Sequence, residues 1–315
     1  MQIGSSGSHR VAPALWVGIA LTLTACSASP PPTPPAHPAP PTTSSPAPLP
    51  PATVELPGRA GQQEVNAATA ALARDLAERR AQAKARSWGL ERLPRTAPPP
   101  PGQRPAVAAG QSGVTLRPGL PPVVQRVPTD DRVIFLTIDD GAAKDPEFAR
   151  MTAELGIPYS TFLTGYLARS DYGYFLGLGG NARVAVNNHT LDHRDMRRLT
   201  PADQRTQICG QQDELTRATG TRPQLFRPPY GEYTDDTLRA AQECGIRAVP
   251  LWNEEAFPDR IEYRYADHRL HPGDIVLTHF RGPGEWSGTM VDMLRRVLRT
   301  ADEQGFTLAL LDDYL

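Results

Sequence analysis

The distribution of proline divides this chain into two parts that cannot fold in the same way. Of its 34 prolines, 24 lie in residues 1–128 and 10 in residues 129–315. Proline fixes φ and has no backbone N–H, so segments rich in it do not form regular helices or sheets. The second part has 187 residues, enough to bury on the order of 70% of its unfolded surface. We therefore expect one folded domain over residues 129–315 and no single compact domain before it.

The first 26 residues predict a signal peptide. Arg10 provides the positive charge, residues 11–23 form the apolar segment, and Leu23-Thr24-Ala25-Cys26 supplies small residues at a cleavage point. This tetrapeptide resembles the lipobox of bacterial lipoproteins, in which the cysteine becomes the lipidated first residue. About 13 apolar residues are fewer than the ~20 that a spanning helix needs. We expect a protein exported from the cytoplasm and held on the bacterial cell membrane by lipid on Cys26; ordinary secretion and an uncleaved anchor are the alternatives.

Three segments separate this leader from the folded domain. Residues 27–62 are a Pro-rich linker that we expect to be disordered, and in polyproline II conformation thirty such residues reach on the order of 90 Å. Residues 63–93 favour helix by composition. Their apolar stripe of Val65, Leu72 and Leu76 is thin, which indicates an exposed helix or a brace on the domain rather than a partner-binding motif. Residues 94–128 predict a second Pro-rich linker.

From residue 132 onward, segments typical of strands and helices alternate. Residues 133–138 are a continuous apolar, β-branched run, as in a strand buried on both faces. Capping residues and glycines predict helices at 146–156, 201–220, 234–245 and 289–304. Further strands are predicted at 161–163, 183–186, 246–249, 275–277 and 306–310. This alternation predicts a parallel α/β sheet or barrel. Because the domain is shorter than the ~250 residues of an eightfold barrel, we expect a distorted (β/α) barrel.

Four polar motifs follow predicted strands, where barrel enzymes carry their active sites. They are Asp139-Asp140-Gly141, the pair His189 and His193, the loop 226–231 with sequence Phe-Arg-Pro-Pro-Tyr-Gly, and Leu277-Thr278-His279. Each alone is a weak signal; Asp-Asp-Gly, for example, is common in turns. The i,i+4 spacing predicts both histidines on one face of a helical turn, close enough to share a metal ion. A carboxylate added to two histidines leaves a coordination position open for water, as catalytic zinc requires.

In order and spacing, these motifs resemble the NodB-homology polysaccharide deacetylases, which form carbohydrate esterase family four, over roughly residues 131–315. The resemblance implies that Asp139 is the general base and that Asp140, His189 and His193 bind a divalent metal, usually Zn²⁺. It also implies an Arg227–Asp139 pair, an oxyanion contact from the Tyr230 backbone N–H, and proton donation by His279 to the departing amine. Amide hydrolysis needs these three functions: an activated water, a stabilised oxyanion and a protonated leaving group. We expect Arg227 to keep Asp139 ionised.

The chain departs from the family pattern in three places. Asn187-Asn188 replaces Gly-Asn before the first histidine, and Phe280 follows His279 where polar residues are common. The Asp-Trp motif that follows Trp252 in the family is missing, and its aspartate tunes the catalytic histidine. Glu255 and Asp259 are the carboxylates nearest to its expected position. We expect one of them, with Asp259 preferred, to reach His279 and raise its pKa.

Cysteine usage gives a further expectation. With Cys26 assigned to lipid, Cys209 and Cys244 remain as an even pair in an oxidising compartment. They lie on successive helices of an α/β fold, which are neighbours. A disulfide is therefore predicted, with two buried thiols as the alternative.

The predicted function is a metal-dependent hydrolase, expected to be monomeric, that removes acetyl groups from an N-acetylated polysaccharide such as peptidoglycan or a chitin-like glycan at the bacterial cell surface. Two alternatives remain: a non-catalytic glycan-binding scaffold lipoprotein, which the missing Asp-Trp favours, and an esterase acting on O-acetylated xylan. The overall net charge of −1 gives no support to nucleic-acid binding. Because the chain has no Walker-type loop or dinucleotide fingerprint, we expect no nucleotide partner. It also has no serine elbow of the kind found in serine hydrolases.

Overall fold

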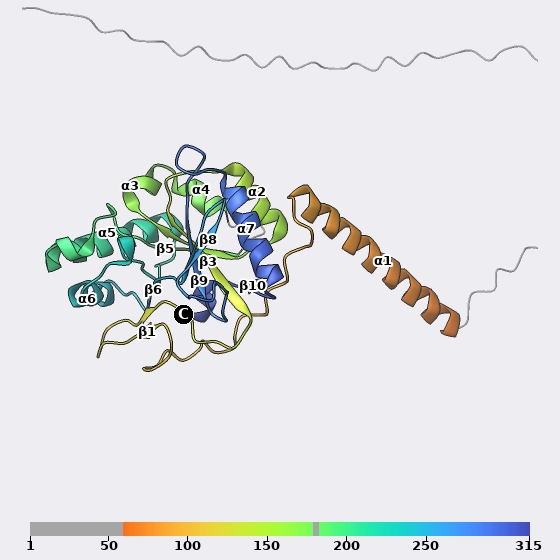
Figure 1. Ribbon diagram of the computed structural model, residues 1–315, viewed down its shortest axis with the longest axis horizontal. Coiled ribbons are helices and arrows are strands. Elements are labelled where there is room, and N and C mark those ends of the chain that lie inside the picture. Colours follow the sequence, from red (N-terminus) through yellow and green to blue (C-terminus); the bar gives the residue numbers. More distant parts are fainter. Residues whose placement is uncertain (1–58, 179–182) are drawn as a thin grey trace, which may run out of the picture. The chain divides into compact units, whose positions relative to one another are not determined.

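The structure is a computed structural model that describes residues 59–178 and 183–315, in which helices surround a set of mainly parallel strands (Figure 1). The predicted signal peptide with Cys26 and residues 27–58 of the first linker lie outside the described residues. The strands are β1 (Val114–Thr115), β2 (Val123–Val124), β3 (Val133–Asp140), β4 (Tyr159–Leu163), β5 (Val184–Asn188), β6 (Val249–Pro250), β7 (Glu254–Ala256), β8 (Ile261–Tyr263), β9 (Ile275–His279) and β10 (Thr307–Leu308). The helices are α1 (Arg59–Ser87), α2 (Pro146–Leu155), α3 (Gly165–Ala168), α4 (Tyr172–Gly177), α5 (Pro201–Thr219), α6 (Asp235–Glu243), α7 (Met290–Glu303) and α8 (Leu311–Tyr314), with 3₁₀ turns at Arg169–Asp171, Met196–Arg198 and Pro229–Gly231.

The strands form a distorted barrel, as predicted. The larger sheet has the order β5-β4-β3-β9-β7-β8, with β10 parallel to the start of β3, and the smaller sheet has the order β1-β2-β6. Parallel bridges join the two sheets, because Phe226 pairs with Asn188 of β5 and Leu225 pairs with Ala248 just before β6. The chain then continues from β6 into β7, which pairs with β9. The strands thus follow one another around an irregular ring.

Strand β3 lies at the centre of this arrangement, and all eight of its residues are buried. It pairs in parallel with β4 and β9, and its register places Asp139 beside His279 and Asp140 beside Leu163. Strand β5 extends the same register, with Asn188 beside Leu163. Because parallel strands end on one rim of the barrel, the motifs that follow β3, β5 and β9 meet there.

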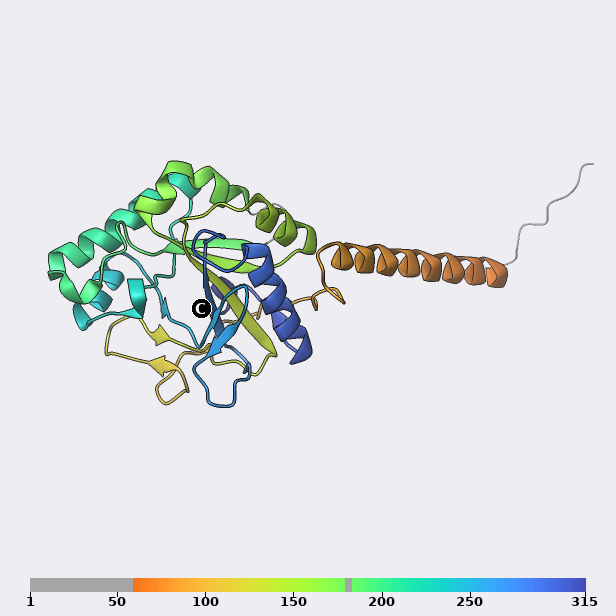
Figure 2. The same ribbon diagram turned by 45° about the horizontal axis from the view of Figure 1, so that its top comes forward.

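The helices begin and end where capping signals predict. Asp145 accepts hydrogen bonds from two backbone N–H groups at the start of α2, and Gly156 closes that helix with φ 64°. Thr200 caps α5, which ends at Gly220 with φ 73°. Helices α5 and α6 lie on one side of the strands and α2 and α7 on the other (Figures 1 and 2). Each pair therefore covers a different part of the barrel core.

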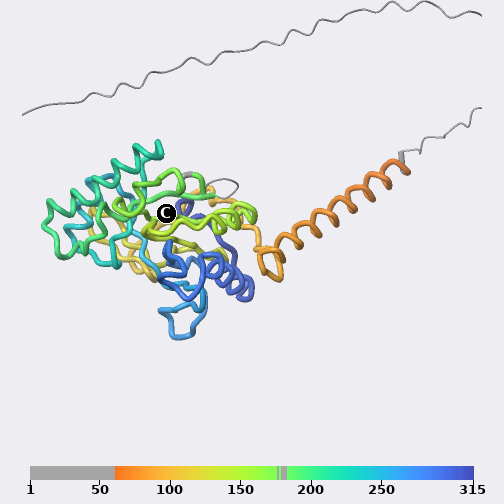
Figure 3. Tube along the Cα trace, turned by 90° about the horizontal axis from the view of Figure 1, so that it is seen from above, coloured from red at the N-terminus to blue at the C-terminus, as the bar shows by residue number. Residues whose placement is uncertain are grey.

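Helix α1 begins at Arg59, within the predicted first linker, and continues unbroken to Ser87 (Figure 3). Its thin apolar stripe is exposed. Val65, Leu72 and Leu76 are 52%, 59% and 46% exposed. Contact with the domain comes from the end of the helix instead, where Ala85 is buried and the Trp88 indole N–H donates to Glu154 at 2.8 Å. Among the described residues, no helix combines the length and hydropathy needed to cross a membrane.

The structure corrects the predicted second linker. Residues 94–128 were expected to lie outside the domain, but β1 and β2 belong to it, and β2 pairs in parallel with β6. Val123, Val124 and Val127 are buried in the core. The preceding prolines do not prevent strand pairing, because a proline lacks the backbone N–H but keeps a carbonyl that can accept a hydrogen bond. The Pro122 carbonyl accepts from Val249 N at 2.9 Å. The high proline content of the segment conceals a short apolar run that completes the barrel.

Candidate metal-dependent active site

The two adjacent aspartates at the end of β3 both face the rim of the barrel. In a regular strand their side chains would point to opposite faces. Asp140, however, has φ 76°, in the left-handed region that non-glycine residues seldom adopt. This turn of the backbone places both carboxylates in one cavity of about 290 Å³ together with His279.

The two histidines lie in a loop after β5, and the predicted helical turn is wrong. Thr190 and His193 have φ values of 72° and 54°, which no right-handed helix contains. Side chains compete with the helical hydrogen bonds here: the Asn188 side-chain oxygen accepts from Thr190 N at 2.8 Å, and Thr190 Oγ1 accepts from His193 N at 3.1 Å. The loop nevertheless brings the imidazole centroids of His189 and His193 to 5.0 Å.

Asp140, His189 and His193 have the arrangement of a metal site. One ligand atom from each lies within 4.8 Å of the others. Asp140 Oδ1 is 3.7 Å from His189 Nε2 and 3.3 Å from His193 Nε2. This oxygen is buried and has no hydrogen-bond partner among the described residues, and buried polar atoms of this kind are rare without a reason. A divalent cation would satisfy the oxygen.

The protonation states of the histidines suit metal binding. His189 Nδ1 lies 2.7 Å from the carbonyl oxygen of Arg227, an arrangement that leaves the Nε2 lone pair facing Asp140, as in metal-bound histidines. Burial lowers the pKa of His189 to about 4 and also lowers the pKa of His193. Both imidazoles are therefore neutral near pH 7, the form that binds metal. One carboxylate with two imidazoles is a donor set typical of catalytic zinc.

Arg281 is a site residue that none of the sequence motifs indicated. Its Nη2 lies 3.3 Å from Asp140 Oδ2, and its Nη1 lies 2.7 Å from Glu285 Oε2. Arg281 thus occupies one oxygen of Asp140 and leaves Oδ1 for a cation. Burial alone would raise the pKa of Asp140, but the neighbouring His189, His279, His193 and Arg281 together lower it below its ordinary value. Asp140 is consequently ionised.

Arg227 is fully buried behind Asp139 and fixes its position. Arg227 Nη1 donates to Asp139 Oδ1 at 2.7 Å and to Thr137 Oγ1 at 2.9 Å. Its Nε and Nη2 donate to the carbonyls of Pro250 and Leu251. The sequence predicted that Arg227 would keep Asp139 ionised, but burial outweighs the arginine and raises the pKa of Asp139. A carboxylate with a raised pKa is a better general base near neutral pH.

His279 has a carboxylate neighbour, and it is Glu255. Glu255 Oε1 lies 3.6 Å from His279 Nδ1. The preference for Asp259 was wrong, because Asp259 lies in the turn between β7 and β8, is exposed and pairs with Arg260 at 3.2 Å. Glu255 is on β7 beside Leu277, which puts it diagonally across from His279 on the neighbouring strand. Burial lowers the pKa of His279, although Asp139 and Asp140 act in the opposite direction.

The cavity contains most of the residues that the sequence motifs indicated. It is lined by Asp139, Asp140, His189, His193, Pro228, Tyr230, Trp252, Glu255, Leu277, His279 and Arg281. Tyr230 has φ 62°, its side chain is 64% exposed, and its ring packs edge-on against His193 at 4.8 Å. Of the residues predicted to be catalytic or to bind metal, only Arg227 does not line the cavity, because it lies behind Asp139.

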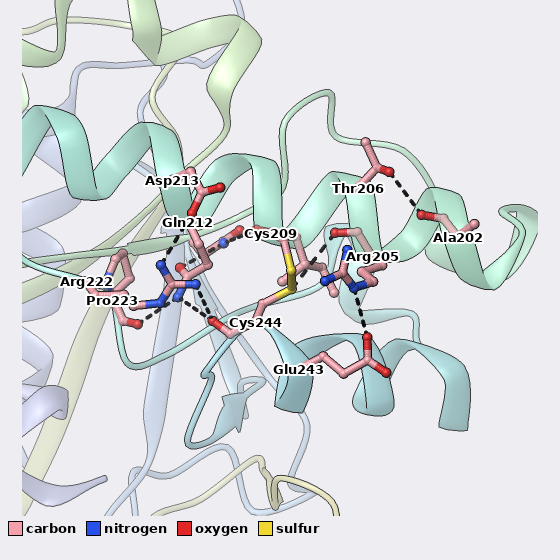
Figure 4. The surroundings of a disulfide bond; sticks show 12 residues. Ala202, Arg205, Thr206, Cys209, Gln212, Asp213, Arg222, Pro223, Glu243 and Cys244 are labelled. Atoms are coloured by element: carbon pink, nitrogen blue, oxygen red, sulfur yellow. Dashed lines mark hydrogen bonds and ion pairs between the residues drawn. A yellow bond between two sulfur atoms is a disulfide. The ribbon is translucent and has the colours of Figure 1, made fainter.

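Cys209 and Cys244 form a disulfide in the structure rather than two buried thiols (Figure 4). Their Cα atoms are 5.0 Å apart and they are separated by 35 residues. The bond joins α5 to the end of α6, and Arg205 and Glu243 form a second link between the same helices. The Arg-Pro-Pro-Tyr loop lies between these two helices in the sequence, so the bond fixes the ends of the segment that carries it.

A buried carboxylate and two neutral histidines that could hold a metal ion lie in one cavity with a second carboxylate and a third histidine, an arrangement suited to hydrolysis. Comparison with known proteins identifies the family. The family model for polysaccharide deacetylase matches residues 126–249. An uncharacterized protein of Streptomyces coelicolor is 45% identical over 197 residues, which cover 62% of this chain and 78% of that protein. The chain belongs to the polysaccharide deacetylase family, and its fold and site are those of a hydrolase of this family.

More distant similarities agree with this assignment. The peptidoglycan-N-acetylglucosamine deacetylase of Bacillus cereus is 25% identical over 186 residues, which cover 56% of this chain and 66% of that enzyme. A crystal structure described as a carbohydrate esterase family four pseudoenzyme from Bacillus anthracis matches with a TM-score of 0.53 and 20% identity, over 63% of this chain and 69% of that one. The structural match concerns the fold alone.

Proposed function

We propose that this protein is a metal-dependent enzyme that removes acetyl groups from an N-acetylated polysaccharide of the bacterial cell wall, and that lipid on Cys26 holds it at the cell surface. The observation that carries the proposal is the buried, unpartnered Asp140 Oδ1. It faces two neutral histidines, and a paired carboxylate base and a histidine lie in the same cavity. The described residues offer no other use for this oxygen.

Each residue has a role that follows from its position. A divalent metal held by Asp140, His189 and His193 would supply a Lewis acid and lower the pKa of a water molecule. Asp139, oriented by Arg227, accepts the proton of the attacking water. His279 donates a proton to the departing amine from the same cavity. The backbone N–H of Tyr230 stabilises the oxyanion.

Three observations bear on the alternatives. A relative carries the name peptidoglycan-N-acetylglucosamine deacetylase, which supports a cell-wall glycan as substrate. The pseudoenzyme with the same fold makes a scaffold role a real alternative, but here the base, the metal set and the third histidine are all present in one cavity. An O-acetyl esterase would use the same residues, so only the substrate separates it from an N-deacetylase.

Metal content and acetate release test the proposal together. The purified full chain should contain about one divalent ion and release acetate from peptidoglycan or from N-acetylglucosamine oligomers, but little from acetylated xylan. His193→Ala should lose both the metal and the activity. Asp139→Asn is the matched control, because it should retain the metal and lose activity. A metal-free protein with full activity would refute the mechanism, and a metal-loaded protein inactive on every glycan would favour the scaffold.

The lipid anchor is tested separately. Cys26→Ser should move the protein out of the membrane fraction.

A further inference from the structure

A second cleft, of about 480 Å³, opens beside the catalytic cavity. It is lined by His193, Arg194, Asp195, Arg198, Leu199 and Tyr230. Two of these residues, His193 and Tyr230, also line the catalytic cavity. A polymer whose reacting unit enters the catalytic cavity would therefore place a neighbouring unit in this second cleft.

The cleft carries two exposed arginines, and one of them has no partner among the described residues. Arg194 is exposed, and among the described residues its side chain makes no hydrogen bond or ion pair. The Arg198 side chain is 85% exposed, and its Nε forms a long ion pair of 3.5 Å with Asp195 Oδ2, a carboxylate that also lines the cleft. Arg197 differs, because it bonds to both Asp195 and Glu232 at 3.0 Å. Residues 129–315 have a net charge of −8, so two exposed arginines in one cleft stand out against an acidic domain.

The arginines sit on a preformed support. The turn Met196–Arg198 is capped by Asp195, whose side chain accepts from Arg197 N at 3.0 Å. Met196 is fully buried beneath it, and the ion pair between Arg197 and Glu232 joins the turn to the segment that follows Tyr230. The exposed ring of Tyr230 adds a rigid, flat face with an apolar body and a polar tip, which suits a sugar ring. A preorganised site of this kind loses less free energy on binding than a flexible one.

We propose that this cleft binds a sugar that carries a carboxylate, next to the sugar that loses its acetyl group. The inference rests on the proposed deacetylase function and narrows its substrate to an acidic N-acetylated glycan rather than a neutral chitin-like one. Arginine presents a planar fork of donors that matches a carboxylate. In peptidoglycan the carboxylate has two sources: the free lactyl group of a muramic acid residue without peptide, and the carboxylates of the attached peptide.

The experiment compares matched glycans on the metal-loaded full chain. The acidic substrate is a peptide-free tetrasaccharide with alternating N-acetylglucosamine and N-acetylmuramic acid. The neutral control is the same tetrasaccharide with its lactyl carboxylates converted to methylamides, and a third substrate carries peptides on the lactyl groups. The N-acetylglucosamine tetramer serves as the reference. KM and kcat are measured by acetate release for the wild type, for the double variant Arg194→Gln with Arg198→Gln, and for Arg217→Gln, an exposed arginine of α5.

We expect the wild type to prefer a carboxylate-bearing substrate over the methylamide about tenfold in kcat/KM, mainly through KM, since charge-assisted hydrogen bonds have about this effect. The double variant should lose this preference but keep its rate on the N-acetylglucosamine tetramer, and Arg217→Gln should keep both. High salt should reduce the preference. A preference for the free lactyl tetrasaccharide would identify the lactyl carboxylate as the ligand, whereas a preference for the peptide-bearing one would identify the peptide carboxylates.

Two results would overturn the inference. One is a wild type that does not distinguish either carboxylate-bearing substrate from the methylamide, and the other is a double variant that distinguishes them as well as the wild type does. Absence of acetate release from every glycan would instead refute the proposed function. In that case, the equilibrium affinities of the same proteins for the acidic tetrasaccharide and for its methylamide test whether the cleft binds a carboxylate. Equal affinities of the wild type for the two glycans would refute this inference.

Discussion

Glu255 Oε1 lies 3.6 Å from Nδ1 of His279, although the chain lacks the Asp-Trp motif that normally places a carboxylate at this histidine. The contact arises from strand pairing. Glu255 lies beside Leu277 in the parallel ladder of β7 and β9, so its side chain reaches the neighbouring strand two residues further on. Burial raises the pKa of Glu255 and lowers that of His279. Both groups are half-buried, so desolvation opposes the charge on each, whereas their mutual attraction favours it.

Glu255→Gln should shift the alkaline limb of the pH–rate profile to lower pH. His279 must be protonated to donate to the amine, and removal of a neighbouring negative charge lowers its pKa further. The rate at neutral pH should fall several-fold while the metal content stays unchanged. The matched control is Asp259→Asn, which removes an exposed carboxylate paired with Arg260 and should have no effect on the profile. Profiles of the two variants that coincide with the wild type would show that His279 needs no carboxylate.

Arg227→Met should impair both folding and the base. The substitution leaves Asp139 buried without its partner, and loss of one member of a buried ion pair costs about 3–5 kcal/mol. It also removes the positive charge that opposes the effect of burial on the pKa of Asp139. That pKa should rise further, so the acidic limb of the pH–rate profile should move to higher pH.

Arg227→Lys tests whether a positive charge alone is enough to stabilise the buried Asp139. A lysine cannot reproduce the bonds to Asp139, Thr137, Pro250 and Leu251, so it should restore only part of the stability; complete rescue would contradict this account.

The sequence predicted those parts of the fold that depend on local chemistry. The apolar run of β3 and the caps of α2 and α5 are local signals, and the structure confirms them. The convergence of the four motifs followed from one rule, that parallel strands end on a common rim. Features that depend on tertiary contacts were missed. The choice of Glu255 over Asp259 requires the register of β7, and the contact of Arg281 with Asp140 joins segments separated by 141 residues.

Other errors came from effects that composition conceals. The prolines around β2 predict a linker, although its two valines form a buried strand in the structure. The histidine spacing suits a helix, but hydrogen bonds to the side chains of Asn188 and Thr190 fix a non-helical loop instead. This loop still brings the two imidazoles close together. The pKa of Asp139 depends on how deeply the folded protein buries it. Sequence motifs indicate which charges meet there but not the extent of that burial.

The disulfide between Cys209 and Cys244 should contribute substantially to stability. A bond that closes a loop of this length stabilises a protein by about 3–4 kcal/mol when it constrains the unfolded chain. The double variant Cys209→Ser with Cys244→Ser should therefore have a clearly lower melting temperature than the wild type. Addition of reductant should lower the wild-type value toward that of the variant and leave the variant unchanged. Thiol titration of the unfolded, unreduced domain should find neither of these two sulfurs free; two free thiols would contradict the bond.

Glu254, next to Glu255 in sequence, should make stability depend on pH. Its side chain is fully buried near Asp274, and burial together with Asp274 raises the pKa of Glu254 from its ordinary value near 4.5 to about 10. The folded protein therefore retains a proton that the unfolded chain releases. This contribution to stability is complete below about pH 4.5 and is lost as pH rises toward 10, by up to about 1.4 kcal/mol per pH unit.

Glu254→Gln replaces the protonated carboxyl with a neutral amide of similar shape and should remove this pH-dependent loss of stability. The free energy of unfolding of the variant, measured in urea at pH 6 and pH 8, should rise relative to the wild type by up to about 2.7 kcal/mol between the two values. The control Glu262→Gln, which changes an exposed residue of β8, should have the same pH dependence as the wild type. A constant difference between Glu254→Gln and the wild type across this range would show that Glu254 is ionised in the folded protein.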